Sequence, residues 1–474
     1  MDVVVDIFSS ERISGWVRGT AHPQRMCLVF GDRMRIVHAA NPRPDLPTPT
    51  AFMHTFEAEE RAWLDRGGDL AIHLAAEYSP RFRLRLPDAG RLASYKVTRA
   101  TQKPIAIIGT SGQISQSWQY DSEDVFALTG LNTGNLAFQY GVYNHIASPK
   151  QLISYKFDPD EVRSTYRVIC IPAANYLYHA FDFADYATRL ERCGLPLLVV
   201  GLGMQAQREV SEVSLKPGTE RLLKVFAEQC HTIGVRGEYS AEVLTKYGIQ
   251  NFSIIGCPSN FINPDPNLGR AVIARYRHAR ERFAYAPTLY PQNSELEALI
   301  AAELGSRLAE VVCQEPLPAI AIARGESRAD LEAWLNEDSG FLSTVDSASR
   351  AVLASRLRCY FGVDEWLEAY RRLDAVLGLR IHGAALGWQA GRAACVVSHD
   401  LRTEELARTM GLPLLRSEDV RRGRLLVQFE EAVAEAASSY DKRRAELAKR
   451  YCELFQSYGV TPSPTLWWLI AHET

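Results

Sequence analysis

The stretch RLDAVLGLRIHGAALGWQAGRAACVVSHD, residues 372–400, decides the fold of this chain. An apolar run at 375–379 leads into Arg380, Ile381 and His382, a small-residue pattern of helical period follows at 383–390, and a second apolar run spans 394–397. This succession of periods predicts a strand, a sharp turn, a helix and another strand. Because parallel strands are usually joined by a helical crossover, the stretch predicts one βαβ unit of a parallel sheet.

Arg380 and His382 follow the first predicted strand of this unit. In an open parallel sheet, ligands bind beyond the carboxyl ends of the strands, where the next helix begins with free N–H groups and the positive end of its dipole. If the strand continues to His382, the spacing of two places both side chains on the same face. We therefore predict that Arg380, His382 and the backbone at Gly383 bind an anion. The alternative is a solvated arginine beside a structural histidine.

Length and composition are those of an ordinary globular protein. The 474 residues are too many for one core and suggest about three domains. The formal net charge of -3 provides no overall attraction to nucleic acid or to an acidic membrane. An anion site must therefore be local.

Nine cysteines are spread along the chain without a CxxC pair, mostly inside apolar runs. This distribution predicts buried thiols in a reducing compartment rather than a disulfide framework or a zinc site. The amino terminus lacks the features of a signal peptide, and no apolar run approaches the length of a membrane span. Carboxylates and histidines do not cluster at the spacing of metal ligands. We expect a cytoplasmic enzyme without metal or cofactor, for which a peripheral membrane contact and a homo-oligomer stay open.

Residues 1–90 differ from the remainder of the chain. Short segments of alternating polarity are separated by Gly, Pro, Asn and Asp turns, with little helical periodicity beyond 57–64. This pattern predicts a small antiparallel β-sandwich that ends in a linker at 87–90. Because residue types suited to catalysis do not gather here, we expect an accessory domain with a packing or oligomerisation role.

Strands alternate with helices from about residue 100, which predicts a Rossmann-like domain over 99–265. One predicted strand, 195–200, ends in GLGMQA at 201–206, a nominal match to the GxGxxA fingerprint of dinucleotide binding. A helix must follow that fingerprint directly, but here a polar stretch with Lys-Pro-Gly at 216–218 follows. We therefore interpret these glycines as a backbone bend at the rim of a cleft and not as an NAD site.

Arg236 follows another predicted strand, 231–235, and so repeats the placement of Arg380. A Pro- and Asn-rich linker begins at 262, and a second Rossmann-like domain is predicted over 266–474. Two arginines at strand ends in two sheets suggest that the domains face each other across a cleft, in a GT-B-like arrangement. A long charged helix at 429–458 is predicted to cross back and brace the first domain. The alternative is a surface helix of the second domain.

Several segments resemble the polysaccharide pyruvyl transferases and run in that family's order. The GVR block at 234–236 and the LRIHG block at 379–383 are the most specific at this separation. The resemblance covers roughly 125–415 and leaves out residues 1–90. The segments are Asn-Thr-Gly-Asn at 132–135, VVGLGMQ at 199–205, GVRGEYSAEVLTKYGI at 234–249, IIGCPSNF at 254–261, LGLRIHGAALGWQAG at 377–391 and VVSHDLRTEELARTMGLP at 396–413.

The chain departs from the family's usual residues at three places. The family often has an aspartate where Asn135 stands, an aspartate where Cys257 stands, and Tyr-Asp-x-Lys where 399–402 read His-Asp-Leu-Arg. Arg402 keeps the positive charge but presents a planar fork, which suits phosphate better than proton transfer. These changes bear on the acceptor sugar more than on the donor.

The resemblance implies phosphoenolpyruvate as the donor and a cyclic pyruvate ketal across two sugar hydroxyls as the product. It places the acceptor sugar in a polysaccharide or a lipid-linked oligosaccharide. This donor carries a phosphate and a carboxylate on one small frame, so separated cations are needed to fix it. We assign the phosphate to Arg380 and the helix that follows, a second clamp to Arg236, and a supporting role to Arg402.

His382 can titrate near neutral pH, so we assign it general acid and base catalysis or a hydrogen bond to the phosphate. At the end of the next predicted strand, His399 and Asp400 either assist it or are ordinary polar turn residues. The resemblance also implies a substrate-binding role for Asn132, Asn135, Gly203 and Gln205.

Two other functions stay open. A nucleotide-sugar glycosyltransferase of the same two-lobed architecture also uses cations at strand ends, to hold a diphosphate. A non-catalytic sugar-binding relative is suggested by the residues at 135, 257 and 402. Label from phosphoenolpyruvate that reaches a glycan excludes the glycosyltransferase, and phosphate release that depends on an acceptor glycan excludes the non-catalytic relative.

Overall fold

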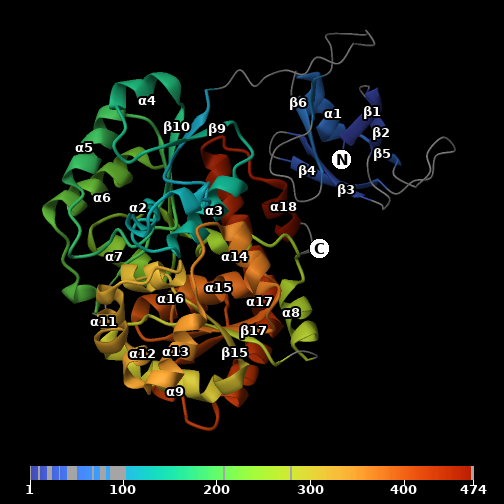
Figure 1. The fold of residues 1–474 in the computed structure, drawn as a ribbon. Coiled ribbons are helices and arrows are strands. Elements are labelled where there is room, and N and C mark those ends of the chain that lie inside the picture. The colour runs from blue at the N-terminus through green and yellow to red at the C-terminus, as the bar shows by residue number, and fades with distance from the viewer. Residues whose placement is uncertain are drawn as a thin grey trace.

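The computed structural model describes residues 2–8, 11–18, 24–30, 33–39, 51–66, 69–74, 82–85, 103–205, 209–277 and 280–470. Two α/β lobes with parallel sheets form most of the described chain, and a group of antiparallel strands lies beside them (Figure 1).

The first lobe is built on parallel strands that pair in the order β11-β10-β8-β9. Strands β12 and β13 pair with each other, and a parallel bridge between Leu202 and Val235 attaches them on the β11 side. Its strands are β8 (Ile105–Ile108), β9 (Lys150–Ile153), β10 (Val168–Pro172), β11 (Leu197–Val200), β12 (Ile233–Val235) and β13 (Phe252–Ile254). Its helices are α2 (Ser122–Leu128), α3 (Asn135–His145), α4 (Pro159–Thr165), α5 (Ala184–Cys193), α6 (Pro217–Gln229) and α7 (Glu238–Lys246), with short 3-10 turns at Ser117–Gln119, Val210–Glu212 and Pro258–Phe261.

The second lobe has a parallel sheet of order β16-β15-β14-β17-β18-β19. Its first strand in the chain is central, and the strand order reverses beside it, as in a doubly wound Rossmann sheet. The strands are β14 (Phe283–Ala286), β15 (Leu308–Val312), β16 (Leu357–Arg358), β17 (Ala375–Gly378), β18 (Ala393–Ser398) and β19 (Leu414–Arg416). The helices are α8 (Leu268–Tyr276), α9 (Ser294–Leu304), α10 (Leu317–Ala323), α11 (Ala329–Glu337), α12 (Phe341–Thr344), α13 (Ser347–Ser355), α14 (Val363–Tyr370), α15 (Ile381–Gln389), α16 (Leu401–Met410), α17 (Leu425–Ser457) and α18 (Pro464–Ile470), with 3-10 turns at Pro291–Asn293, Gly305–Arg307 and Ser417–Asp419. The prediction of an α/β fold with parallel sheets is confirmed.

The predicted βαβ unit at 372–400 consists of β17, α15 and β18. The condition that the strand continues to His382 is not met, because Arg380 is the N-cap of α15 and its carbonyl accepts a 3.2 Å hydrogen bond from the Ala384 N–H. His382 therefore lies in the first turn of a helix, and the spacing argument for a shared face does not apply. Small residues let this helix lie close to the sheet, since a Cβ at Gly387 would come 2.6 Å from Val376 Cγ2.

Helix α17 has 33 residues and joins the cores of the two lobes. Phe429 and Val433, in its first half, belong to the core of the second lobe. Tyr451 and Phe455, in its second half, pack with residues of β8, β10 and β11, and α18 completes this layer. Between the two halves, buried Arg444 donates hydrogen bonds to three backbone carbonyls of the segment 260–265. The helix therefore ties one lobe to the other (Figure 1).

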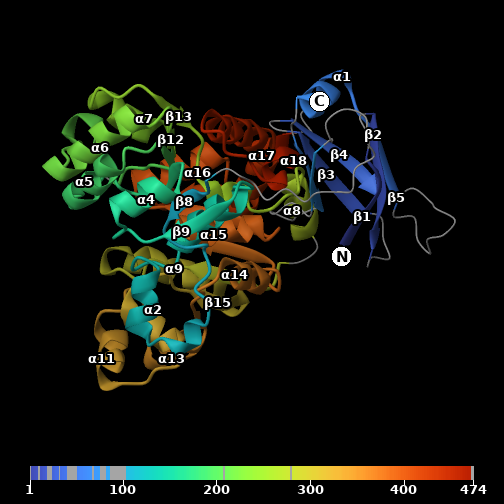
Figure 2. The same ribbon diagram turned by 90° about the horizontal axis from the view of Figure 1, so that it is seen from above.

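The N-terminal strands form two antiparallel sheets, β1-β2-β5 and β4-β3-β6-β7. Residues of both sheets and of α1 share one hydrophobic cluster. These strands lie next to α18 (Figure 2), where burial raises the pKa of Cys27 on β3 to about 12, although a hydrogen bond with Trp468 opposes the rise. The assignment as a β-sandwich accessory domain stays a prediction, and the expected linker at 87–90 lies outside the described residues. The elements are β1 (Asp2–Phe8), β2 (Arg12–Arg18), β3 (Gln24–Phe30), β4 (Arg33–Ala39), β5 (Ala51–Thr55), α1 (Ala58–Asp65), β6 (Asp69–Leu74) and β7 (Phe82–Arg85).

All nine cysteines lie in described segments and carry free thiols, which are buried except at half-buried Cys359. The prediction of buried thiols is therefore confirmed. Within the described ranges, no helix combines the length and the apolar character that a membrane span requires.

Candidate active site

Three arginines mark the site: Arg236 follows β12, Arg380 caps α15, and Arg402 lies in the first turn of α16. Arg236 is only 3% exposed and Arg380 only 8%, which is rare for arginine. Burial lowers the pKa of His382, and the charges of Arg236 and Arg402 lower it further. Burial likewise lowers the pKa of His399, with Arg402 and Arg380 adding to the effect. Arginines from both lobes therefore act on one electropositive region.

Arg380 is oriented by residues of the second lobe. Its guanidinium pairs with Glu315 and donates a 3.2 Å hydrogen bond to the carbonyl of Thr288. The guanidinium carbon lies 4.9 Å from the centre of the Tyr290 ring, and the Tyr290 hydroxyl also donates to Glu315. The Nε of Arg380 is buried without a hydrogen-bond partner. The side chain is thus fixed, and one N–H is left for a ligand.

Arg236 is held by residues of the first lobe. Its Nη1 donates a 2.9 Å hydrogen bond to Asn175 Oδ1, and its guanidinium carbon lies 5.5 Å from the centre of the Phe138 ring. Gly203 provides the space for this side chain, because a Cβ there would come 2.7 Å from Arg236 Cδ. Gln205 supports the arrangement indirectly, since its Oε1 accepts a 3.2 Å hydrogen bond from Asn175 Nδ2. Nε and Nη2 of Arg236 are buried without partners.

His382 is the buried histidine of the site. Its Nε2 lies 3.6 Å from the sulfur of Cys257, and its ring centre lies 5.9 Å from that of Phe138. Burial and then the charges of Arg236 and Arg402 hold its pKa well below the ordinary value. Burial and the two arginines thus favour the neutral imidazole, a direction opposite to the expectation that His382 titrates near neutral pH. Its catalytic role stays a prediction.

Asp400 caps α16 by accepting a 2.7 Å hydrogen bond from the Thr403 N–H. Its Oδ2 lies 3.8 Å from His399 Nε2 and 3.6 Å from Arg402 Nη2. Burial tends to raise the pKa of Asp400, but Arg402, His399 and the hydrogen bonds from Thr403 outweigh burial and lower it. The carboxylate is thus a charged helix cap that orients Arg402. A role as an ordinary turn residue accounts for the cap but not for this charge pairing.

Asn132 connects its loop to the second lobe. Its Nδ2 donates a 2.9 Å hydrogen bond to Glu315 Oε2, and Glu315 also pairs with Arg380. Asn135 instead donates to the carbonyls of Thr129 and Gly130, at 3.1 and 3.3 Å. The structure therefore brings Asn132 to the site through Glu315, whereas Asn135 stabilises its own loop.

Gly383 lets α15 begin close to the sheet. A Cβ at this position would come 2.5 Å from Ala286 Cβ and 2.9 Å from Gln314 Nε2. The N–H groups of the first helical turn have no carbonyl partner within the helix. Gln314 Nε2 is also buried without a partner. The start of α15 therefore adds N–H donors beside Arg380.

Several residues of the site were missed by the sequence analysis. Glu315 follows β15, Asn175 follows β10 and Tyr290 follows β14. Each lies shortly after a buried strand of a parallel sheet, which is where ligand-binding residues gather. A search for polar residues after every apolar run, rather than for arginines alone, would have found Glu315 and Asn175.

Unpartnered donors define what the site can bind. They are Nε and Nη2 of Arg236, Nε of Arg380, Nε of Arg402 and Nε2 of Gln314. Buried donors in proteins nearly always have an acceptor, so this group suits a small ligand with oxygen atoms at two ends. In the described part of the chain, no group of three or more His, Cys, Asp and Glu residues could hold a metal ion.

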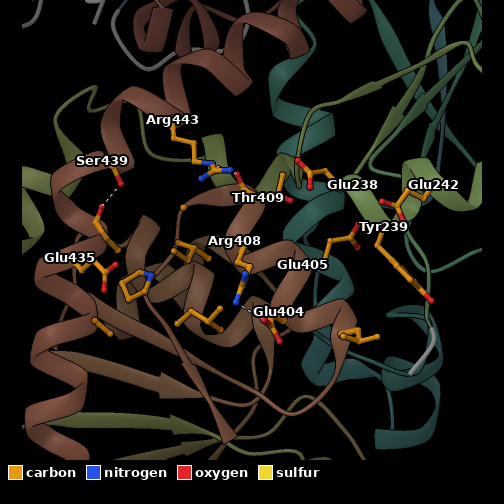
Figure 3. A pocket seen from close by; sticks show the side chains of 17 residues that line it. Glu238, Tyr239, Glu242, Glu404, Glu405, Arg408, Thr409, Glu435, Ser439 and Arg443 are labelled. Atoms are coloured by element: carbon orange, nitrogen blue, oxygen red, sulfur yellow. Dashed lines mark hydrogen bonds and ion pairs between the residues drawn. The ribbon is translucent and has the colours of Figure 1, made fainter. Parts of the chain in front are cut away.

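A pocket of about 740 Å³ lies between α7, α16 and α17 (Figure 3). Glu238 and Glu242 of α7 and Glu404 and Glu405 of α16 line it. Glu405 accepts a 2.8 Å hydrogen bond from the Ser240 N–H. Arg408 and Arg443 also line the pocket, but Arg236, Arg380 and Arg402 do not, so this pocket is distinct from the arginine site.

A search of curated proteins gives no match. Among solved structures, the chain is similar to a UDP-N-acetylglucosamine 2-epimerase from Rickettsia bellii, with 10% identity and a TM-score of 0.38 over 76% of this chain and 97% of that one. It is also similar to Anabaena HepE in complex with UDP and glucose, with 10% identity and a TM-score of 0.40 over 75% of this chain and 100% of that one.

A sequence model of one family matches residues 132–400, which is more than half of the chain. The matched range contains Arg236, Arg380 and His382, and it ends at Asp400. The chain therefore belongs to the polysaccharide pyruvyl transferase family, as the resemblance predicted.

Proposed function

We propose that this protein transfers the pyruvyl group of phosphoenolpyruvate to two hydroxyls of a sugar, in a GT-B-like cleft between the lobes. The acceptor is a polysaccharide or a lipid-linked oligosaccharide, and the products are a cyclic pyruvate ketal and phosphate. Family membership supports pyruvyl transfer to a sugar. The observation that carries the donor assignment is the set of buried, unpartnered arginine N–H groups contributed by both lobes. A cytoplasmic location and a homo-oligomer stay predictions.

In this proposal the arginines bind different groups of phosphoenolpyruvate. Arg380 and the N-terminus of α15 bind the phosphate, because a guanidinium and free backbone N–H groups suit a phosphate dianion. Arg236 binds the carboxylate from the first lobe. Arg402, oriented by Asp400, supports the phosphate. Binding therefore fixes the donor at both ends and orients its double bond.

The first half of the reaction forms one carbon–oxygen bond. The methylene carbon of phosphoenolpyruvate takes up a proton, its neighbouring carbon becomes cationic, and a sugar hydroxyl attacks that carbon. With the dianion bound, the imidazolium form of His382 donates its proton to the methylene carbon, and the neutral imidazole that results accepts the proton that the attacking hydroxyl loses, so the imidazolium is restored. The arginines disfavour an imidazolium in the absence of anions, and the charge of the bound dianion counteracts this.

The second half exchanges phosphate for the other hydroxyl. The bond between the ketal carbon and the phosphate oxygen breaks, and phosphate leaves with the electron pair. The second sugar hydroxyl attacks the same carbon, and its proton passes to the phosphate. Arg380 and Arg402 stabilise the leaving phosphate, which is where negative charge develops.

The test is substitution of Arg380. We expect Arg380→Ala to lower kcat/KM for phosphoenolpyruvate by about 100- to 1000-fold, as loss of one strong donor at a charged transition state does. Arg380→Lys should retain part of the activity, because it keeps the charge but loses the fork. Arg408→Ala on α16 is the matched control, since this arginine is exposed and pairs with Glu404. Acceptor-dependent phosphate release is the readout, and thermal unfolding verifies the fold. Wild-type turnover by Arg380→Ala contradicts the assignment.

Labelled donors separate the alternatives. Carbon label from phosphoenolpyruvate should enter the glycan together with phosphate release. Label that enters only from a nucleotide sugar would instead establish a glycosyltransferase. Glycan binding without release of phosphate would establish a non-catalytic relative.

A further inference from the structure

A second pocket, of about 650 Å³, lies at the strand ends of the first lobe. One wall comes from the segment that follows β8 and includes α2, and the other comes from Ser154, Tyr155 and Lys156, which follow β9. The strand order reverses beside β8, whose neighbours are β9 and β10. Ligands of open parallel sheets bind at such a switch point, and this volume suits a small organic ligand.

Two tyrosines line this pocket while keeping much of their surface exposed. Tyr120 is 42% exposed and Tyr155 is 44% exposed. The Tyr155 hydroxyl lies 3.1 Å from that of Tyr176, and its ring centre lies 5.6 Å from that of Tyr186. The far end of Tyr155 is therefore held in place while part of its ring surface is open to a ligand. Such a ring is a preformed platform that loses little entropy on binding.

The polar groups of the pocket are balanced in charge. Asp124 contributes a carboxylate and Lys156 an ammonium group, and both residues are exposed. This balance disfavours a polyanion such as a nucleotide, and the charged groups disfavour a fatty chain. A sugar ring fits both features, because its C–H faces pack on aromatic rings while its hydroxyls hydrogen-bond to carboxylate, ammonium and hydroxyl groups.

The pocket is connected to the arginine site along the strand ends. Tyr176, which holds Tyr155, is next in the chain to Asn175, which accepts a hydrogen bond from Arg236. These residues follow β10, and Arg236 follows β12, two strands away. The pocket itself lies beyond β8 and β9, three and four strands from β12, so it is about 14 to 19 Å from the strand end that carries Arg236. A short oligosaccharide bridges such a distance.

Each wall of the pocket is anchored on a different lobe. The segment with α2 follows a first-lobe strand, yet Ser122 donates to Glu326, and Arg324 Nη2 donates a 2.7 Å hydrogen bond to the carbonyl of Tyr120. Tyr155 belongs to the first lobe. The pocket thus lies where the lobes meet, as the arginine site does.

We propose that this pocket binds a sugar residue of the acceptor glycan, a few residues along the glycan from the sugar that receives the pyruvyl group. This subsite rests on the proposed function for the identity of its glycan. In this subsite Tyr120 and Tyr155 determine which acceptor glycan binds. Neither residue belongs to the group that binds the donor.

Glycan binding by the full chain tests the subsite directly. The probes are hexasaccharides of glucose, of galactose and of mannose, measured by saturation-transfer NMR without phosphoenolpyruvate. We expect the wild-type protein to bind at least one probe, and Ala127→Trp to weaken that binding about tenfold or more. Ala127 is exposed on α2, so a tryptophan there fills the pocket without removing a buried contact. Ala333→Trp, exposed on α11, makes the same change elsewhere and should bind as the wild type does.

Substitutions of Tyr155 test the platform itself. Tyr155→Phe keeps the ring and should bind nearly as well as the wild type, whereas Tyr155→Ala should bind as poorly as Ala127→Trp. Failure of the wild type to bind any of the three probes overturns the subsite, as does equal binding by the wild type and Ala127→Trp. Phosphate release from phosphoenolpyruvate is measured separately, because its absence in the wild type would contradict the proposed donor and leave glycan binding untouched.

Discussion

Buried histidines couple the stability of this protein to pH. Burial lowers the pKa of His145 to about 3, although its hydrogen bond with the Phe261 carbonyl opposes the change. The pKa values of His382 and His399 are lowered as well, first of all by burial. In the unfolded chain a histidine titrates near 6.5. Below that pH the unfolded chain binds protons that the folded protein does not, so stability is lost as the pH falls toward the folded pKa.

We expect the free energy of unfolding to decrease below pH 6.5 by up to about 1.4 kcal/mol per pH unit for each such histidine. Denaturant titrations at pH 7, 6 and 5 measure this slope. His145→Gln should reduce the slope by about one histidine's share, whereas substitution of exposed His179 by Gln should leave it unchanged. An unchanged slope in His145→Gln would show that this histidine is not the source.

At the residue scale, the sequence predicts cations but not their partners. Arg236 and Arg380 could be found because each directly follows an apolar run that has to be a buried strand. Glu315, which pairs with Arg380, and Cys257, which lies against His382, come from distant segments. Only the fold determines that such segments meet, so their contacts, and the depressed pKa of His382, could not be predicted.

Elements with a strong apolar signal were predicted well, and an edge strand was not. The long helix predicted at 429–458 is α17, Leu425–Ser457. Strand β9 was missed because it is an edge strand whose residues are half-buried or exposed, so its sequence, KQLI, lacks the pattern of a covered strand. The sequence pattern predicts a helix from residue 383, whereas α15 begins at Ile381. The prediction is late because an N-cap residue such as Arg380 has no apolar pattern that marks the start of a helix.

Arg444 of α17 provides a prediction about this helix. It is 1% exposed and donates to three carbonyls of the segment 260–265. Arg444→Ala leaves these acceptors buried without donors, so we expect a loss of about 3 kcal/mol of unfolding free energy. Chemical denaturation measures it, with exposed Lys442→Ala on the same helix as the control, which should change stability by less than about 0.5 kcal/mol. A small effect of Arg444→Ala would mean that water replaces the guanidinium.

At the scale of the whole molecule, we predict that the two lobes unfold cooperatively. Helix α17 contributes Phe429 to the core of one lobe and Phe455 to the core of the other. Phe455→Ala should therefore lower the hydrogen-exchange protection of β10 and of β17 together, by about 3 to 5 kcal/mol. Val427→Ala, at an exposed position of the same helix, is the control. Loss of protection in β10 alone would show that the lobes unfold independently.

At the scale of the whole molecule, the sequence predicts two parallel-sheet lobes but not how segments are shared between them. Alternation of strands and helices indicates the class, because a parallel sheet covered by helices on both faces buries continuous apolar runs. The segment with α2 follows a first-lobe strand, and Arg324 and Glu326 of the second lobe anchor it through the Tyr120 carbonyl and the Ser122 hydroxyl. Such sharing depends on which surfaces meet, and local residue patterns carry no information about it.

Helices α17 and α18 cover one face of the first-lobe sheet, and this arrangement affects how the chain folds during its synthesis. Ile107, Cys170 and Val200 lie under Tyr451 and Leu469, near the other end of the sequence. During translation this apolar face has been synthesised long before its cover leaves the ribosome. The nascent chain thus exposes an apolar sheet surface until α17 and α18 have been synthesised. Such exposure favours binding by chaperones, and it favours aggregation when synthesis is faster than chaperone binding.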